Sequence, residues 1–227
     1  MWALVAVVTT LVLVIAGVLV LSMNRKQHGS AEKKVFLVGC SGSGKTKLFY
    51  NLMTNESLST VTSQVPNQFV MKSGDKSITV VDLPGHSRCR TEVMPGVEQA
   101  AGIVFVIDSE TAMSQMASIV DFLYNLLSTR AIIQKRVPFL VVASKTDLFG
   151  HKDIDLIQSE LENEFDFMRE NRKKSNYVQG DEAVQLFLGD EDQEFKFSQL
   201  LNKVSFSSCS VNSNDTQSVR DFIKSLL

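Results

Sequence analysis

The sequence is poor in cysteine, proline and histidine, with three, four and three of them among its 227 residues. The cysteines Cys40, Cys89 and Cys209 lie far apart, which excludes a disulfide framework and a cysteine metal site and favours reduced thiols. The histidines are equally scattered and form no metal-binding motif. A large excess of one charge is also lacking. The formal net charge of −2 argues against a protein that grips nucleic-acid phosphates and predicts no direct DNA binding.

Charged side chains are absent from residues 1–23, an apolar run long enough to cross the roughly 30 Å hydrocarbon core of a bilayer. Residues 24–33 follow as a polar segment that begins with Asn24, Arg25 and Lys26. This positive charge predicts that the rest of the chain faces the cytosol. A signal peptide usually has a shorter apolar region after a basic start, and a buried core helix is seldom apolar on every face. We therefore expect a transmembrane helix at 1–23 and a juxtamembrane linker at 24–33.

Short apolar runs alternate with amphipathic stretches behind the linker. The runs are KVFLVGC, SITVVDL, GIVFVID, VPFLVVAS and KVSFSSC, which begin at residues 34, 77, 102, 137 and 203. Near-continuous apolar runs are typical of parallel strands buried on both faces. Apolar residues at three-to-four spacing predict helices at 45–53, 111–129, 152–172 and 215–227. The sequence therefore predicts an α/β domain, a doubly wound and mostly parallel sheet, over residues 34–227.

An acidic stretch at 175–200 interrupts this alternation. Between residues 175 and 196 it contains six acidic residues and a single lysine. Such a charge run usually forms a solvated surface. We expect an insertion that forms a solvated loop, with recognition of a partner as the alternative.

The most specific motif directly follows the first predicted strand. Eight residues match G-x-x-x-x-G-K-[ST] in full: Gly39, Cys40, Ser41, Gly42, Ser43, Gly44, Lys45 and Thr46. Glycines let backbone N–H groups turn toward a polyphosphate, and the helix that follows presents its positive dipole end to the same oxygens. We expect Lys45 to reach the β- and γ-phosphates and Thr46 to ligate Mg²⁺. A chance Gly/Ser turn would rarely place Lys-Thr between a strand and a helix.

A second motif, Asp82-Leu83-Pro84-Gly85, closes the next predicted strand. A carboxylate at this strand end is placed to hold Mg²⁺ through a water molecule, so we expect Asp82 to do so. Three residues later, the N–H of Gly85 is expected to bond the γ-phosphate. A simple Asp-x-Pro-Gly turn is the alternative interpretation.

A third motif, Ser144-Lys145-Thr146-Asp147, closes a later strand. The Asp147 carboxylate can accept the N1–H and 2-amino hydrogens of guanine, which adenine does not offer. Lys145 is expected to lie along the base and to brace the phosphate loop. Alone this pattern is weak, but as the third element in this order it predicts a guanine-nucleotide site.

In this order the three motifs resemble those of the Ras-like small GTPases, in the branch of Arf and Sar. A membrane-spanning amino terminus is foreign to those proteins, but it is found in the β subunit family of the signal recognition particle receptor. The chain resembles that family over essentially its whole length. The family-specific part is DLPGH at 82–86 together with EFKFSQL at 194–200.

The resemblance implies a P-loop small GTPase that binds GTP and Mg²⁺ and spans the endoplasmic reticulum membrane once, with its GTPase domain in the cytosol. It further implies binding of the receptor α subunit in the GTP state, in support of co-translational targeting, with the ribosome or the translocon as further contacts. Three alternatives stay open: an Arf/Sar-like membrane-trafficking GTPase, an ATP-dependent P-loop phosphotransferase, and a nucleotide-bound scaffold that never cycles.

The resemblance also assigns roles to residues that the motifs leave open. It places Cys209, Ser210 and Val211 in the last loop that contacts guanine. It implies a switch threonine as a further Mg²⁺ ligand, and Thr62 matches the family pattern more closely than Thr60. Ser144 stands where asparagine is usual, so we expect a hydrogen bond that supports the phosphate loop to be lost or shortened.

His86 occupies the position where Ras-type enzymes carry the glutamine that orients the attacking water. A histidine can position water, but it titrates near neutrality and has no amide. His86 is therefore a candidate catalytic residue, with closure over nucleotide or partner as an equal alternative. Because the glutamine is missing, we expect slow intrinsic GTP hydrolysis.

Overall fold

The computed structural model describes residues 2, 33–61, 63–85, 96–97, 99–179 and 188–227. The predicted transmembrane helix and linker therefore lie outside the described residues, apart from Trp2 and Lys33. Among the residues that are described, no helix is long and apolar enough to cross a membrane. Lys34–Leu227 form a compact unit of their own.

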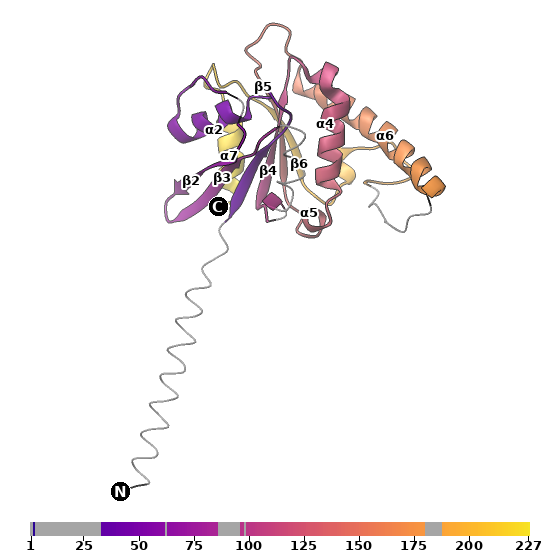
Figure 1. Ribbon diagram of the computed structural model, residues 1–227, viewed down its shortest axis with the longest axis horizontal. Helices are drawn as coiled ribbons and strands as arrows, with labels where there is room; N and C mark the ends of the chain where they lie inside the picture. The colour runs from indigo at the N-terminus through magenta and orange to yellow at the C-terminus, as the bar shows by residue number, and fades with distance from the viewer. Residues whose placement is uncertain (1, 3–32, 62, 86–95, 98, 180–187) are drawn as a thin grey trace. The chain divides into compact units, whose positions relative to one another are not determined.

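A six-stranded sheet forms the centre of this unit, in the order β2-β3-β1-β4-β5-β6 (Figure 1). Its strands are β1 (Lys34–Val38), β2 (Asn67–Ser73), β3 (Lys76–Asp82), β4 (Gly102–Asp108), β5 (Phe139–Ser144) and β6 (Val204–Ser208). All neighbouring pairs are parallel except β2 with β3, which is antiparallel. The predicted α/β fold with a mostly parallel sheet is thus confirmed.

Helices cover both faces of the sheet. One face packs against α2 (Lys45–Thr54) and α7 (Gln217–Ser225), and the other against α4 (Ala112–Leu127), α5 (Arg130–Gln134) and α6 (Ile154–Gln179). A single 3₁₀ turn, η1 (Phe197–Gln199), precedes β6. Because helices bury both faces of the sheet, nearly every residue of a central strand is apolar, which explains the unbroken apolar runs in the sequence.

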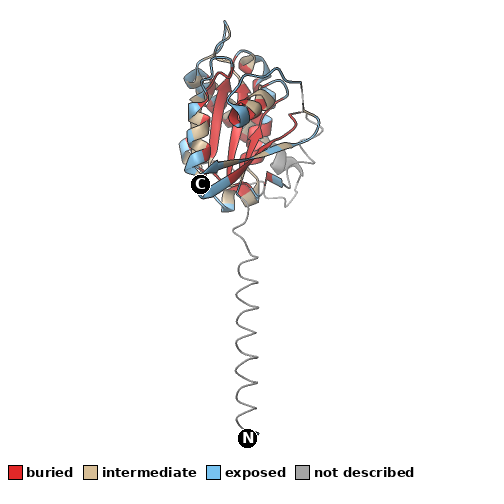
Figure 2. Ribbon diagram, turned by 90° about the vertical axis from the view of Figure 1, so that its left-hand side faces the viewer, coloured by how far each residue is buried: buried red, intermediate tan, exposed pale blue. Residues whose placement is uncertain are grey.

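Strand β4 shows how the two apolar cores divide. Ile103, Phe105 and Ile107 belong to the core under α4 and α6, whereas Val104 and Val106 belong to the core under α2 and α7. Successive side chains of a strand point to opposite faces, so a single apolar run supplies both cores. Figure 2 shows the central strands buried along their length. This rigid centre fixes the positions of the loops that follow the strands.

The acidic stretch at 175–200 is only partly the solvated loop that we expected. Helix α6 continues to Gln179, and the acidic residues described at 190–194 are exposed. However, Phe195 is 1% exposed and packs on Phe165 of α6 with ring centroids 4.9 Å apart, and Leu188 and Phe197 are also buried. The expectation of a solvated loop is therefore wrong for Leu188, Phe195 and Phe197, because these apolar residues enter the core.

Arg169 holds this segment to α6. Its guanidinium donates hydrogen bonds to the carbonyl oxygens of Leu188, Asp190 and Gln193 at 3.1, 3.0 and 2.7 Å. The side chain is buried and lies over the Phe195 ring. The segment 188–193 forms no helix or strand, so its carbonyl groups need other hydrogen-bond donors. The guanidinium of Arg169 donates to three of them.

One strand and one α-helix were not predicted from the sequence. Strand β2 alternates half-buried and exposed residues, because it lies at the edge of the sheet and contacts the core with one face. Helix α5 has five residues, too few for a periodic apolar pattern to emerge.

Candidate functional site

The carboxyl ends of the central strands meet at one edge of the sheet. The register pairs Leu37 with Asp82 and Asp108 with Ser144, so the loops after β1, β3, β4 and β5 start side by side. Ligands of open α/β sheets bind at this edge, outside the carboxyl ends of the strands. All three sequence motifs follow strands that end here.

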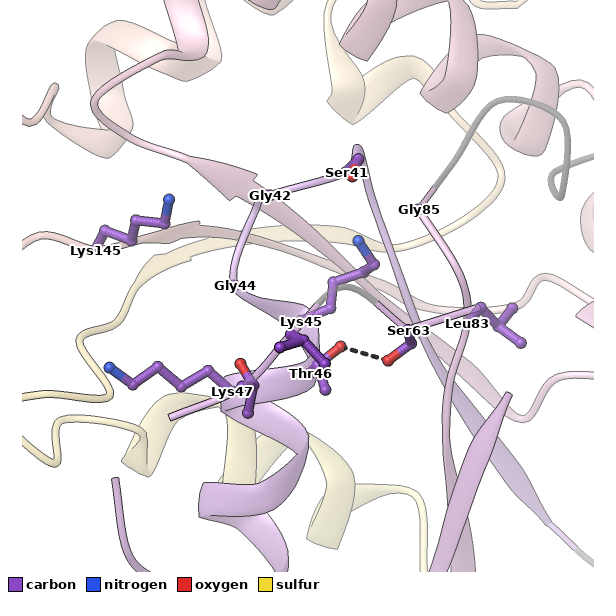
Figure 3. A pocket seen from close by; sticks show the side chains of 12 residues that line it. Ser41, Gly42, Gly44, Lys45, Thr46, Lys47, Ser63, Leu83, Gly85 and Lys145 are labelled. Atoms are coloured by element: carbon purple, nitrogen blue, oxygen red, sulfur yellow. Dashed lines mark hydrogen bonds between the residues drawn. The ribbon is translucent and has the colours of Figure 1, made fainter. Parts of the chain in front are cut away.

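The loop at 39–44 wraps the start of α2. Gly39, Gly42 and Gly44 have φ values of 146°, 80° and 86°, a backbone conformation that glycine adopts without strain. Lys45, the first residue of α2, is 5% exposed, and its Nζ donates a 2.7 Å hydrogen bond to the Cys40 carbonyl. Figure 3 shows the loop curved around a pocket that Ser41, Gly42, Gly44, Lys45 and Thr46 line. Backbone N–H groups and an ammonium group at a helix N-terminus can bind a polyphosphate.

Asp82 and Thr46 meet beside this loop. Thr46 Oγ1 donates to Asp82 Oδ2 at 2.8 Å, and Ser63 Oγ lies 3.1 Å from the same oxygen. Ser63 Oγ also lies 2.9 Å from Thr46 Oγ1, the contact that Figure 3 draws. Asp82 is fully buried. Among the described residues, its Oδ1 has no hydrogen-bond partner. Burial raises the pKa of Asp82 above its ordinary value, against the lowering effect of the Thr46 hydrogen bond and of Lys45.

These three oxygen-bearing side chains fit a hard divalent cation. Mg²⁺ takes oxygen ligands and keeps several waters, and a buried carboxylate oxygen without a partner is the group that such a water could bond. Ser63 was missed from the sequence, although it is the neighbour of Thr62. Thr62 itself lies outside the described residues, and Thr60 lines the same pocket.

Gly85 lies directly against the phosphate-type loop. A Cβ at this position would be 2.5 Å from Lys45 Nζ and 2.8 Å from the Ser41 nitrogen, so only glycine fits. The motif after β3 therefore contacts the loop after β1. His86 follows immediately but lies outside the described residues.

Ser144 keeps the hydrogen bond that we expected to be lost or shortened. Its Oγ lies 2.7 Å from the Ser43 carbonyl and 3.0 Å from the Ile107 carbonyl. Serine is therefore long enough to reach the loop. What serine lacks is a second hydrogen, since one hydroxyl donates a single hydrogen bond.

Lys145 forms an ion pair that the sequence did not indicate. Its Nζ lies 2.7 Å from Asp108 Oδ2, at the end of β4. Burial alone would raise the pKa of Asp108, but the Lys145 hydrogen bond and charge hold that pKa below its ordinary value. The pair fixes the lysine stem beside the pocket that it lines. The position of Asp108 at a strand end of the same edge was the signal that could have found it.

Asp147 is held by the loop after β6. Ser210 Oγ donates to its Oδ1 at 2.6 Å, and the Asn212 amide donates to its Oδ2 at 2.7 Å. These two hydrogen bonds lower the pKa of Asp147, so its carboxylate is charged at neutral pH. A carboxylate has about four acceptor sites, and these bonds leave two for a ligand. Asn212 is a further residue that the sequence did not suggest.

The loop after β6 is itself tied to the loop after β5. The backbone nitrogen and the hydroxyl of Thr146 both donate to the Cys209 carbonyl, at 3.4 and 3.1 Å. Burial raises the pKa of the Cys209 thiol to about 12, so this side chain packs as a neutral group. Val211 is buried as well. The structure thus brings the loop 209–211 beside Thr146 and Asp147, and its contact with guanine stays a prediction.

Comparison with known proteins gives the same family from sequence and from structure. A family model described as "Signal recognition particle receptor beta subunit" matches residues 30–204. The rat protein named "Signal recognition particle receptor subunit beta" is 33% identical over 186 residues, which cover 80% of this chain and 69% of the rat protein. The chain belongs to the signal recognition particle receptor beta subunit family.

Solved structures of this family superpose on the chain. The mammalian SRP receptor structure shares 31% of its residues with the chain at a TM-score of 0.77, covering 86% of this chain and 100% of the other. The SRb-GTP/SRX complex from Chaetomium thermophilum matches at a TM-score of 0.72 with 19% identity, over 84% of this chain and 98% of that chain, which shows the shared fold. The six-stranded sheet is thus that of a small GTPase.

Proposed function

We propose that this chain is the GTP-binding β subunit of a signal recognition particle receptor, anchored in the endoplasmic reticulum membrane by residues 1–23. In its GTP state it binds the receptor α subunit and so supports co-translational targeting, with the ribosome or translocon nearby. The observation that carries the proposal is the joint placement of Lys45, Asp82 and Asp147 at one edge of the sheet, in a chain that belongs to this family.

The phosphates would lie against the loop 39–44. Lys45 would move its ammonium from the Cys40 carbonyl to the phosphate oxygens, because an anionic acceptor binds the ammonium more strongly than an uncharged carbonyl does. Gly85 lies beside Ser41 and Lys45, so its N–H would be able to donate a hydrogen bond to a terminal phosphate. This contact would couple the γ-phosphate to the segment after β3, as order–disorder switching in GTPases requires.

Thr46 and Asp82 would hold Mg²⁺, with Asp82 acting through water and with Thr62 or Ser63 as the switch hydroxyl. When bound, Mg²⁺ would supply positive charge that offsets the negative charge of the phosphates. The Asp82 Oδ1 atom supports this role, because a buried carboxylate oxygen without a hydrogen-bond partner is costly unless a ligand compensates it.

The Asp147 carboxylate would choose the base. Its two open acceptor sites match the N1–H and 2-amino group of guanine, and the amide of neighbouring backbone at 209–211 would serve the guanine oxygen. The Lys145 stem would cover one face of the ring. Adenine offers a single donor group at its amino position and a bare N1, so it would leave the charged carboxylate poorly paired.

Hydrolysis in this proposal is slow without assistance, since His86 stands in place of glutamine. The GTP state would then be long-lived, and the signal would be read through partner binding. Rapid single-turnover hydrolysis by the purified chain would contradict this part of the proposal.

The test has two steps and uses the full chain in detergent or nanodiscs. First, we expect GTP affinity to exceed ATP affinity roughly 100-fold or more, because the charged Asp147 would be left unpaired by adenine. Equal affinities would favour the phosphotransferase alternative. Lys45→Ala should abolish binding, whereas Lys152→Ala, with a lysine outside the pocket, should retain it.

Second, the α subunit should be captured by the chain loaded with GTP and lost with GDP. Capture in both states, with nucleotide that does not exchange, would favour the non-cycling scaffold. Failure of capture together with normal GTP selectivity would favour an Arf/Sar-like trafficking GTPase. Resistance of the chain to alkaline carbonate extraction from membranes tests the anchor separately.

A further inference from the structure

The edge of the sheet opposite the candidate site is strongly basic. Strands β1, β4, β5 and β6 begin there, and α5 and the end of α7 lie beside them, at the lower edge of the sheet in Figure 1. We call this surface the basic edge and define it by its nine cationic residues: Lys33, Lys34, Lys72, Lys76, Arg130, Lys135, Arg136, Lys203 and Lys224. Eight of them are exposed and Lys34 is half-buried. Among the described residues, the acidic side chains near them in sequence are Asp75, beside Lys76, and Asp221, one helical turn before Lys224.

Backbone contacts bring these segments together. The Ala101 nitrogen donates to the Lys34 carbonyl, and the Phe139 nitrogen donates to the Lys203 carbonyl, both at 2.8 Å. The Asn202 amide donates to the carbonyls of Ile132 and Val137 at 3.1 and 2.8 Å, which fixes the α5 turn beside Lys203.

The β2–β3 hairpin extends the same edge outward. Lys34 pairs with Thr79, so Lys76 and its partner Ser73 project beyond the start of β1. The carboxyl terminus of the chain lies here as well. A Cβ at Gly102 would collide with the side chain of Leu226, so the end of α7 lies at the start of β4. Cations from five separate segments therefore share one surface.

This concentration contrasts with the rest of the chain. The whole protein has a net charge of −2, so its acidic residues outnumber its basic ones. A surface dominated by one sign on a nearly neutral protein creates a directed field that attracts a partner of opposite charge.

We propose that the basic edge docks on the anionic headgroups of a phospholipid bilayer. Leu201 supports a lipid surface as the occupant: it is 65% exposed, precedes Lys203 by two residues, and suits the apolar boundary beneath the headgroups. A folded RNA would offer this aliphatic side chain no comparable environment. Anionic lipids attract clusters of exposed Lys and Arg within about a Debye length of the surface.

The course of the chain agrees with this occupant. The domain begins at Lys34, within the basic edge, and the linker 24–33 precedes it directly. The ten residues of this linker span at most about 35 Å when fully extended. A bilayer that held residues 1–23 would therefore lie within about that distance of Lys34. The inference rests on the membrane attachment proposed above.

The test uses the full chain in nanodiscs of phosphatidylcholine, with or without about a third phosphatidylserine. Hydrogen exchange is followed in two segments, the hairpin 70–78 and the turn 129–138. We expect exchange in both segments to slow at least about threefold with phosphatidylserine, and high salt to reverse the protection.

Lys72→Gln/Lys76→Gln should reduce the protection, while the charge-matched control Lys152→Gln/Lys196→Gln, whose lysines lie elsewhere, should not. Equal exchange in both lipid compositions would overturn the proposal. Stronger protection by added ribosomal RNA than by phosphatidylserine would overturn it too, in favour of an RNA partner. Failure of the chain to enter nanodiscs would instead contradict the anchor, so the two failures are distinguishable.

Discussion

Ser144 Oγ lies 2.7 Å from the carbonyl oxygen of Ser43, 101 residues earlier in the chain. This hydrogen bond joins the end of β5, which leads to the candidate base-binding residue Asp147, to the loop that would hold the phosphates. One hydroxyl hydrogen serves this contact while a second carbonyl, that of Ile107, lies 3.0 Å away. The two halves of the proposed nucleotide site are thus linked through a single donor.

Removal of this donor should weaken nucleotide binding. Ser144→Ala leaves the buried Ser43 carbonyl without its partner, a cost of about 1 kcal/mol or more, so we expect GTP affinity to fall ~5-fold or more. Ser144→Asn is the matched variant, because its amide has two hydrogens for the two carbonyls, and it should bind GTP at least as well as the parent chain. Titration calorimetry of the three proteins measures this. An unchanged affinity in the alanine variant would show that the bond does not support the site.

Asp147→Asn should change which base is bound. The amide no longer accepts two hydrogens from guanine, so GTP affinity should fall roughly 100-fold or more, while a purine with an oxygen in place of the 2-amino group should gain. Competition between GTP and xanthosine triphosphate reports the change. The control is Asn212→Ala, which removes one donor to Asp147 and should retain the preference for guanine. A loss of affinity that is equal for all purines would argue against base recognition by Asp147.

The raised pKa of Asp82 predicts a pH dependence of magnesium binding. Since burial lifts this pKa above the ordinary value of 3.8, the carboxyl takes up a proton at a higher pH than a normal aspartate does. Mg²⁺-dependent nucleotide affinity should therefore decline as the pH is lowered toward this pKa. The folding stability of the metal-free protein should change in the opposite direction and increase as the pH is lowered. The reason is that the folded state binds this proton more tightly than the unfolded state does.

Affinity titrations from pH 8 to pH 5 in Mg²⁺ and in EDTA test the expected decline of Mg²⁺-dependent affinity. The Mg²⁺ series should fall more steeply than the EDTA series, and Asp82→Asn should remove the difference between them. Parallel series in the parent chain would disprove the role assigned to Asp82.

Ser63 competes with Thr62 and Thr60 for the role of switch hydroxyl. Its Oγ contacts both Thr46 and Asp82, so we expect Ser63→Ala to weaken Mg²⁺-dependent GTP binding by about 1 kcal/mol, or ~5-fold. Thr60→Ala should have little effect, and binding in EDTA should be the same in both variants. If Thr62→Ala alone shows the Mg²⁺-specific loss, the assignment from family resemblance is the correct one.

Phe195 should behave as a core residue despite its acidic surroundings. It is 1% exposed and packs on Phe165 and Phe197, so Phe195→Ala should lower the free energy of unfolding by about 3–5 kcal/mol. The neighbouring exposed Glu194→Ala should change it by about 0.5 kcal/mol or less. Urea unfolding followed by circular dichroism compares the two. Similar small effects would restore the view of this segment as a solvated loop.

The elements predicted well from the sequence are those with strong local signals. The runs that became β1, β3, β4, β5 and β6 are apolar because both of their faces are buried, and the helices between them have amphipathic periodicity. The edge strand β2 and the short α5 lack such signals. The acidic residues of 175–200 led us to predict a solvated loop. That prediction overlooked Phe195 and Phe197, which are buried because they pack against α6.

The candidate site shows the same division. Lys45, Thr46, Asp82 and Asp147 stand in motifs whose spacing is set by a strand and the turn that follows it, so local sequence was sufficient to nominate them. Asp108, Ser63 and Asn212 belong to no motif. They contact the site because the parallel strands and their loops meet at one edge of the sheet. A local sequence pattern does not predict this arrangement, since it depends on how distant strands pair.

The sequence alone determined the kind of domain, the phosphate-type loop and the residue types available for a nucleotide, since each follows from short-range chain geometry. Only the tertiary structure decided which distant side chains complete the site and which cations gather on the opposite edge. These depend on strand register, and register arises from the packing of the whole sheet between its two helical layers.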